Sequence, residues 1–311
     1  MRKVVIIGAG HVGSMCGLNL AQVGVCDEIV LMDKIEGKAE AQAKDIADAT
    51  VFMQRVPIVR AGTYSDCDDA DIIVNAIGMP RKENQTRLDM LDDSIQMMKD
   101  VIERIKQTKF SGYFVSITNP CDVIVNYARE QLGLPKNKIF GTGTSLDTAR
   151  LKLTLHHATG IAIPSIQCFA LGEHGDSSMV PMSHISFMGK PLLELKEEES
   201  DTYGMITEEM LSDRTHQLGM EIVIGKGSTE FGIGAAVADI CKAIFYDENK
   251  IIPVSTLLEG EYEEEGIMVG VPAIIGKHGV ESIVSLRLTE EEMKKFHASC
   301  EVVRSYGKKI K

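Results

Sequence analysis

A glycine-rich turn near the N-terminus most constrains the fold. The segment GAGHVG (residues 8–13) follows the apolar run KVVII (3–7) and opens a stretch with apolar residues at helical spacing. In this setting Gly8 permits a tight turn, Gly10 lets a ligand approach bare backbone, and Gly13 lets the helix pack on the strand. The order of strand, glycine turn and helix predicts the first unit of a dinucleotide-binding fold. Glycines that serve packing alone are the alternative.

An acidic residue indicates which dinucleotide binds. Asp33 ends the run EIVLMD, twenty residues after the last glycine of the turn. Its carboxylate can accept both ribose hydroxyls of an adenosine, whereas it would repel a 2′-phosphate, which favours NAD over NADP. We therefore predict NAD as the cofactor. The candidate NAD-binding residues in this part of the chain are Gly8, Gly10, His11, Val12, Gly13, Asp33 and Gly78.

Short apolar runs alternate with helical segments in the first half of the chain, and the pattern changes after about Thr142. The alternation predicts an α/β fold, a Rossmann doubly wound parallel sheet. The later pattern predicts an α+β substrate domain, with three strands at hairpin spacing and a closing helix opened by a threonine cap. Because 311 residues are too many for one typical core, we expect two domains, at 1–143 and 144–311. The expected strands are 3–7, 28–32, 71–77, 112–118 and 165–171, and the expected helices include 11–23, 36–53, 92–107, 203–224 and 231–246.

Composition excludes several classes of partner. A formal charge of −12 with no long basic run argues against nucleic acid, and no apolar stretch is long enough for a membrane span. The seven cysteines form no CxxC pair, which argues against a disulfide framework or a zinc site, so we expect buried thiols and no metal. The N-terminus lacks the regions of a secretory signal. We expect a cytoplasmic protein.

Four motifs follow one another along the chain: GMPRKENQTRLDM (78–90), ITNPCDV (117–123), GTGTSLDTAR (141–150) and LGEHGDS (171–177). In order and spacing they resemble the L-lactate/L-malate dehydrogenase family of NAD-dependent L-2-hydroxyacid dehydrogenases. The resemblance runs from Val4 to about Val303 and is strongest to the L-lactate branch. It implies hydride transfer between nicotinamide and C2 of a small 2-oxo or 2-hydroxy acid.

The resemblance assigns roles to residues of these motifs. His174 is implied as the proton donor and acceptor, and Asp147 as the carboxylate that binds its ring and raises its pKa. Arg150 is implied to grip the substrate carboxylate with a planar fork that lysine lacks. Asn119 matches the family asparagine near nicotinamide and substrate. Thr229 matches a threonine of the substrate pocket, although a helix cap explains it nearly as well.

Two arginines in the 78–90 segment, the family's lid, bear on catalysis and on the choice of substrate. Arg87 is implied to stabilise the charge developing on the ketone oxygen. Arg81 stands where malate enzymes of the family place an arginine and lactate enzymes a glutamine, and an unpaired guanidinium beside a methyl group is costly to bury. The GEHGDS, KGST, GVPAII and FHASCEVV segments favour the lactate branch. We predict an L-lactate dehydrogenase, with malate or a bulkier 2-hydroxy acid (hydroxyisocaproate-type) as alternative substrates.

Two further positions bear on regulation by a sugar bisphosphate. Lys152 and Gln167 stand at the positions where an arginine and a histidine bind fructose 1,6-bisphosphate in activated relatives. A lysine lacks the bidentate fork of arginine, and a glutamine carries no charge. We therefore predict weak or no activation by this ligand. The family implies a homotetramer or dimer. A protein that binds NAD as a sensor without turnover is the remote alternative, but it predicts damage to a proton relay that this sequence retains.

Overall fold

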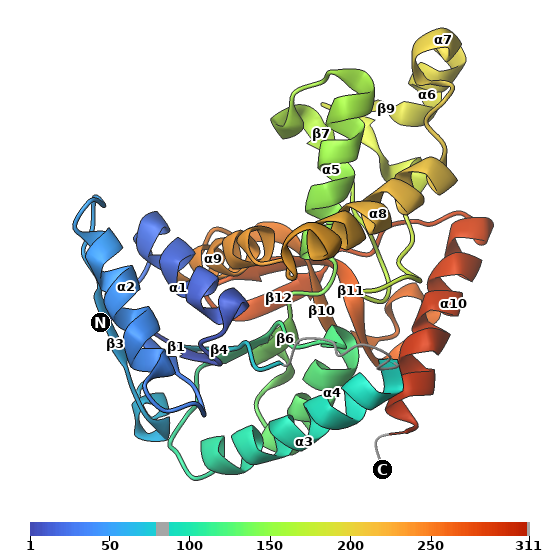
Figure 1. Cartoon of the computed structure of the whole chain (residues 1–311). Coiled ribbons are helices and arrows are strands. Elements are labelled where there is room, and N and C mark those ends of the chain that lie inside the picture. The colour runs from blue at the N-terminus through green and yellow to red at the C-terminus, as the bar shows by residue number, and fades with distance from the viewer. Residues whose placement is uncertain (79–86, 310–311) are drawn as a thin grey trace.

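The computed structural model describes residues 1–78 and 87–309, with the side chains of residues 87–90 left out of the description. In this part of the chain, nine strands form one sheet in the order β12-β11-β10-β6-β5-β4-β1-β2-β3 (Figure 1). Strands β1 to β6 run parallel, and β10 to β12 join them antiparallel. The strands are β1 (Lys3–Ile7), β2 (Glu28–Met32), β3 (Ile58–Ala61), β4 (Ile72–Asn75), β5 (Tyr113–Ser116), β6 (Ile139–Gly141), β10 (Lys250–Glu259), β11 (Glu265–Gly276) and β12 (Gly279–Ile283).

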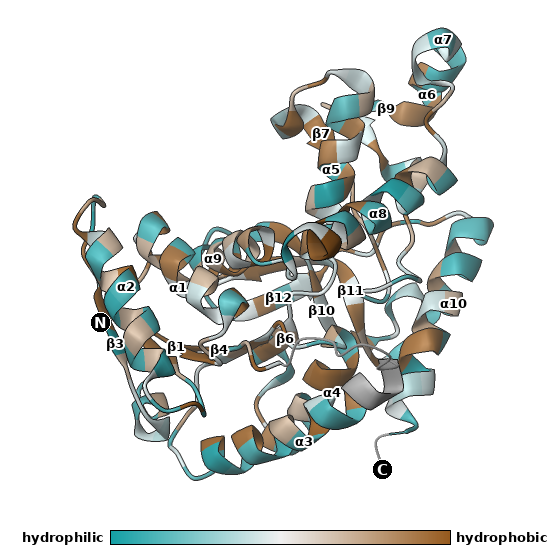
Figure 2. Cartoon of the chain, in the orientation of Figure 1, coloured by the Kyte–Doolittle hydropathy of each residue, from teal (hydrophilic) through white to brown (hydrophobic). Residues whose placement is uncertain are grey.

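Helices cover both faces of this sheet. Alternate residues of β1 face opposite sides, so that Val4 and Ile6 join one apolar core while Val5 and Ile7 join the other. The first core packs under α1, α2 and α9, and the second under α3, α4 and α10. Figure 2 shows the strands as mostly apolar and the helices as mixed, as expected for a sheet between two helical layers. These helices are α1 (His11–Val23), α2 (Lys38–Thr50), α3 (Arg87–Ile105), α4 (Cys121–Leu132), α9 (Phe231–Phe245) and α10 (Glu290–Gly307).

A smaller unit projects from the sheet, at the top right of Figure 1, around a third apolar core. Within the described residues it contains a three-stranded sheet in the order β7-β8-β9. Helix α8 runs from this unit back across the base of α5. The elements are α5 (Ser145–Thr159), β7 (Ile166–Gln167), β8 (Ser186–Phe187), β9 (Lys190–Pro191), α6 (Leu192–Glu198), α7 (Ser200–Tyr203) and α8 (Glu208–Lys226), and the 3-10 turns of the chain are η1 (Tyr64–Cys67), η2 (Lys136–Lys138), η3 (Ile163–Ser165), η4 (Met182–His184) and η5 (Glu261–Glu263).

The fold class predicted from the sequence is confirmed: a Rossmann lobe is followed by an α/β lobe that adds antiparallel strands. The expected strand at 165–171 was too long, since only 166–167 form a strand. The expected buried thiols are also confirmed, because all seven cysteines are free and buried. Among the described residues, no helix has the length and apolarity needed to cross a membrane. We propose the boundary between the two lobes at residues 143 and 144.

The backbone of the glycine turn leaves no room for a Cβ atom at Gly8 or Gly13. Gly8 has a φ of 103°, and a Cβ on it would lie 2.6 Å from the carbonyl oxygen of Ala76 in the turn after β4. A Cβ on Gly13 would lie 1.8 Å from the carbonyl oxygen of Gly8. Both contacts are far inside van der Waals distance and involve backbone atoms, which side-chain motion cannot relieve. Glycine at these two positions is therefore what lets α1 start directly over β1.

We predict that Gly13→Ala lowers the free energy of unfolding by about 1–3 kcal/mol, because the added methyl group must push α1 away from the turn. Urea unfolding followed by circular dichroism measures this change. Gly225→Ala is the matched control, since Gly225 also lies in a helix and its Cβ would meet no described atom within 4 Å. The control should keep or slightly raise the stability. Equal stability of both variants would contradict the explanation.

Candidate active site

The carboxylate of Asp33 lies at the end of β2 beside the glycine turn. Its Oδ2 accepts a hydrogen bond from the Ala9 backbone N–H at 2.9 Å, and its Oδ1 accepts one from the Ile35 N–H at 2.9 Å. Lys38 in the first turn of α2 places its Nζ 3.4 Å from Oδ2, and a Cβ on Gly10 would lie 3.9 Å from the same Nζ. Lys38 therefore adds a cation beside the turn that no sequence motif indicated.

This arrangement fits a dinucleotide. Gly10 caps α1 without a side-chain hydrogen bond, so the first backbone N–H groups of the helix face the turn and favour an anion such as a pyrophosphate. Among the other candidates, Val12 is partly buried and Gly78 is exposed at the start of the 78–90 segment. The His11 side chain is 82% exposed and its Nδ1 lies 3.4 Å from the Glu230 carboxylate.

Asn119, predicted to lie near both nicotinamide and substrate, is three residues after the end of β5. Asn119 is exposed, and its backbone carbonyl oxygen accepts a hydrogen bond from Ser94 Oγ in α3 at 2.9 Å. Thr229 is partly buried just before α9, whose N-cap residue is Glu230 and not Thr229. The alternative explanation of Thr229 as a helix cap is therefore wrong.

His174, Asp147 and Arg150 lie together between α5 and the loop after Leu171. The His174 Nδ1 is 2.6 Å from Asp147 Oδ2, and Arg150 Nη1 is 3.5 Å from Asp147 Oδ1. Asp147 and Arg150 lie one helical turn apart in α5, so both side chains leave the same face. Only 6% of the Asp147 side chain is exposed, against 23% for His174. The buried carboxylate thus binds one ring nitrogen of a histidine whose side chain remains partly exposed.

Charge and burial set the protonation of these groups. The Asp147 carboxylate raises the pKa of His174 from an ordinary 6.5 to about 9, although burial opposes the shift. Burial also opposes ionisation of Asp147, but the charge and hydrogen bond of His174 hold its pKa below the usual range. Burial lowers the pKa of Arg150, and Asp147 opposes that change. The ionised aspartate and the protonated histidine therefore stabilise each other near neutral pH.

A second carboxylate holds the backbone of His174. Asp122, in the first turn of α4, is buried, and its Oδ2 accepts a hydrogen bond from the His174 N–H at 2.8 Å. Burial raises the pKa of Asp122 to about 6. The ITNPCDV motif contained Asp122, but its contact with a residue 52 positions away left no signal in the sequence.

Two of the predicted site residues are not described in full. Arg81 lies outside the described residues. Arg87 begins α3, but its side chain also lies outside the description, so its expected approach to the substrate oxygen stays a prediction.

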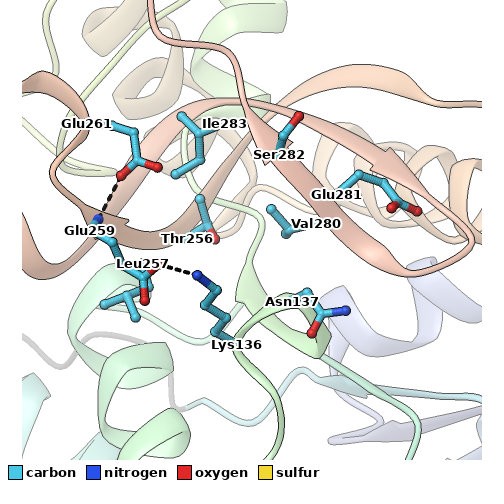
Figure 3. Close-up of a pocket in the computed structure, with 10 residues that line it drawn as sticks. All are labelled: Lys136, Asn137, Thr256, Leu257, Glu259, Glu261, Val280, Glu281, Ser282 and Ile283. Carbon is cyan, nitrogen blue, oxygen red and sulfur yellow. Dashed lines mark hydrogen bonds and ion pairs between the residues drawn. The ribbon is translucent and has the colours of Figure 1, made fainter.

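A pocket shown in Figure 3 lies elsewhere, at the β10 to β12 edge of the sheet. Two of its charged groups pair with each other, because Lys136 forms an ion pair with Glu259. The Glu259 backbone N–H donates to the Glu261 carboxylate at 2.7 Å. None of the predicted site residues that the structure describes lines it. The lining residues are Lys136, Asn137, Thr256, Leu257, Glu259, Glu261, Val280, Glu281, Ser282 and Ile283.

Nearly the whole chain matches models of known protein families. Residues 2–141 match the NAD-binding domain of lactate/malate dehydrogenases, and residues 144–311 match the α/β C-terminal domain of the same enzymes. The chain belongs to the lactate/malate dehydrogenase family. It is an NAD-dependent oxidoreductase, as predicted.

Individual relatives agree with this assignment. The chain is 41% identical over 305 residues to an L-lactate dehydrogenase of Fusobacterium nucleatum, covering 98% of this chain and 96% of the relative. Its structure is similar to the ligand-bound minor L-lactate dehydrogenase of Enterococcus mundtii, with a TM-score of 0.95, 34% identity, and coverage of 100% and 98%. It is also similar to a malate dehydrogenase of Cryptosporidium parvum, with a TM-score of 0.91, 30% identity, and coverage of 99% and 98%.

We predict that Asp147→Asn lowers the pKa of His174 from about 9 toward its ordinary value of 6.5, because the substitution removes the largest cause of the shift. An NMR titration of the His174 ring, assigned with a His174→Asn variant, measures the change. Asp122→Asn is the matched control, because Asp122 raises the pKa of His174 by less than Asp147 does. An unchanged His174 pKa in Asp147→Asn, or a larger decrease in the control, would show that Asp147 is not the main cause.

Proposed function

We propose that this dehydrogenase interconverts pyruvate and L-lactate, with His174 as the proton donor and acceptor. The hydrogen bond of 2.6 Å between His174 and a buried carboxylate, with Arg150 beside it, is the observation that carries the proposal. The names of the relatives from Fusobacterium nucleatum and Enterococcus mundtii support lactate as the substrate.

The two ring nitrogens of His174 would have different roles in the proton transfer. Because Nδ1 of His174 donates to Asp147, Nε2 is the nitrogen that can exchange a proton with the substrate oxygen. Bound NADH would supply the hydride for C2 of the 2-oxo acid. Protonated His174 would donate to the oxygen during reduction, and the neutral ring would accept the proton during oxidation. Such a transfer contributes about 10² to 10⁴ in rate.

Arg150 would set the orientation of the substrate. Its guanidinium is mostly buried, with 13% of the side chain exposed, and it retains donors beyond the one directed at Asp147. A planar fork that binds both oxygens of a carboxylate fixes rotation as well as position. Arg87, Asn119 and Thr229 are proposed to complete the substrate site, Arg87 by stabilising the developing charge on the oxygen.

The cofactor site is proposed on the residues around the glycine turn and the exits of the neighbouring strands. The glycine geometry and the position of Asp33 support it. The proposed NAD-binding residues are Gly8, Gly10, His11, Val12, Gly13, Asp33, Gly78 and Asn119.

Arg81 keeps malate open as a second candidate, because its charge could pair with the second carboxylate of oxaloacetate. A bulkier 2-oxo acid is a third candidate. A non-catalytic NAD sensor is disfavoured because His174, Asp147 and Arg150 lie together in one site.

We predict that kcat/KM is higher for pyruvate than for oxaloacetate, 2-oxoisocaproate or phenylpyruvate, measured from NADH absorbance. Arg81→Gln should widen the preference for pyruvate over oxaloacetate, because it removes the charge that could pair with the second carboxylate. His174→Asn should lose about 10² to 10⁴ in rate with every substrate. A preference for oxaloacetate that Arg81→Gln abolishes would instead identify a malate dehydrogenase. Undiminished turnover by His174→Asn would exclude the proposed proton relay.

We also propose a cytoplasmic homotetramer or dimer that responds weakly or not at all to fructose 1,6-bisphosphate. Lys152 is partly buried and Gln167 is exposed on β7, where its amide oxygen accepts a hydrogen bond from the Met188 N–H at 2.9 Å. Millimolar fructose 1,6-bisphosphate should change the rate by less than about twofold, because neither side chain offers a bidentate cation to a phosphate. Steady-state assays at subsaturating pyruvate test this, and activation of about tenfold would contradict it.

A further inference from the structure

The loop that carries His174 is held at several points by other elements. Its ends, Leu171 and Met179, pair through two backbone hydrogen bonds of 2.9 Å. Near its start, Asp122 of α4 accepts from the His174 N–H, and Ser299 Oγ of α10 accepts from the Glu173 N–H at 2.8 Å. These contacts fix the first half of the loop.

Helices α10 and α8 both hold the second half of the loop. Ser177 Oγ lies 3.0 Å from Ser299 Oγ of α10, and a histidine of α8 contacts the next residue. A hydrogen bond of 3.0 Å joins His216 Nε2 to Ser178 Oγ, the last loop residue before Met179. Both residues are partly buried, and the charge of His216 also helps to hold the pKa of Asp147 below its usual range, after the larger effects of His174 and Arg150. His216 therefore lies close to the proton relay and contacts, through Ser178, the loop that carries His174.

The same face of α8 also contacts the residue proposed to bind the substrate carboxylate. Gly219 follows His216 by three positions, which places both on one side of the helix. A Cβ on Gly219 would lie 3.1 Å from Arg150 Nη1, so the guanidinium rests against the bare helix backbone. One turn of α8 thus contacts both the loop of His174 and the side chain of Arg150.

We propose that His216 is a positioning residue for the reaction: through Ser178 it holds the His174 loop in register with Arg150, using α8 as the common support. The proposal rests on the proposed function. Proton transfer and carboxylate binding act on the same substrate, so their relative placement decides the rate, and a displacement of about 1 Å can cost about a hundredfold. A hydrogen bond that fixes the loop against α8 acts on that placement.

The first test compares His216→Phe, which removes the hydrogen bond, with His216→Gln, whose amide can still bond to Ser178 without a ring or a charge. His216→Phe should lower kcat by about tenfold or more, with the pyruvate KM and the NADH Kd changed by less than about twofold. His216→Gln should recover kcat to within about threefold of the original enzyme. Wild-type kcat in His216→Phe, or no recovery in His216→Gln, would overturn the proposal.

A matched control and a double variant separate positioning from general damage. His184→Phe removes another histidine–serine hydrogen bond, of 2.8 Å to Ser183, in a pair whose serine contacts Glu292 of α10. It should leave kcat unchanged. Ser178→Ala should lower kcat as His216→Phe does, and the double variant should be no worse than either single one, because one interaction is lost in all three. Losses that multiply, or an equal loss in His184→Phe, would refute the role.

The NMR resonance of the His174 Nδ1 proton provides a readout that does not depend on turnover. His216→Phe should shift or broaden it by disturbing the bond to Asp147, whereas His184→Phe should not. If the original enzyme reduces no 2-oxo acid, the proposed function fails, and this resonance still decides whether His216 positions His174. An identical resonance in all the variants would overturn the positioning proposal alone.

Discussion

The hydrogen bond between His174 and Asp147 is the interaction on which the site depends. It joins a loop residue to a helix residue 27 positions earlier. The Asp147 side chain in this bond is only 6% exposed. A carboxylate removed from water is costly unless a charged partner and hydrogen bonds compensate it, and the imidazolium provides both. The same bond fixes the ring orientation, so protonation, tautomer and geometry are set together.

Two carboxylates near one imidazole have opposite protonation tendencies. Asp147 faces the ring and Arg150, and its pKa is held below the usual range, whereas burial raises the pKa of Asp122 to about 6. The first contacts the titrating ring and the second contacts the backbone of the same residue. Asp147 therefore has the larger electrostatic effect on His174 and orients its ring, whereas Asp122 holds the backbone of His174 and has a smaller electrostatic effect on it.

The sequence predicted most of the fold. It also led, through a family resemblance, to predicted site residues of which His174, Asp147 and Arg150 lie together, but it indicated few of the contacts that support them. Continuous apolar runs made β1 and β2 easy to place, while β3 is only partly buried and β6 has three residues, so neither produced a recognisable pattern. Asp147 and Arg150 were identified because the GTGTSLDTAR motif resembles a motif of the family. The contact of Ser178 with His216 spans 38 residues, and no local pattern encodes it. Lys38 was overlooked because only the folded turn brings its ammonium group beside Gly10.

The continuity of the large sheet has a consequence for recombination between relatives. Strand β10 pairs with β6 at Ser255 and Gly141, so backbone hydrogen bonds cross from one lobe to the other. A Cβ on Gly141 would lie 2.7 Å from Cys121 Sγ and 3.2 Å from Ser255 Cβ, which shows how tightly that seam is packed. A chimaera that joins the first lobe of this chain to the second lobe of another family member must therefore match residues along the seam. Compatible active-site residues alone would not make the two halves fit.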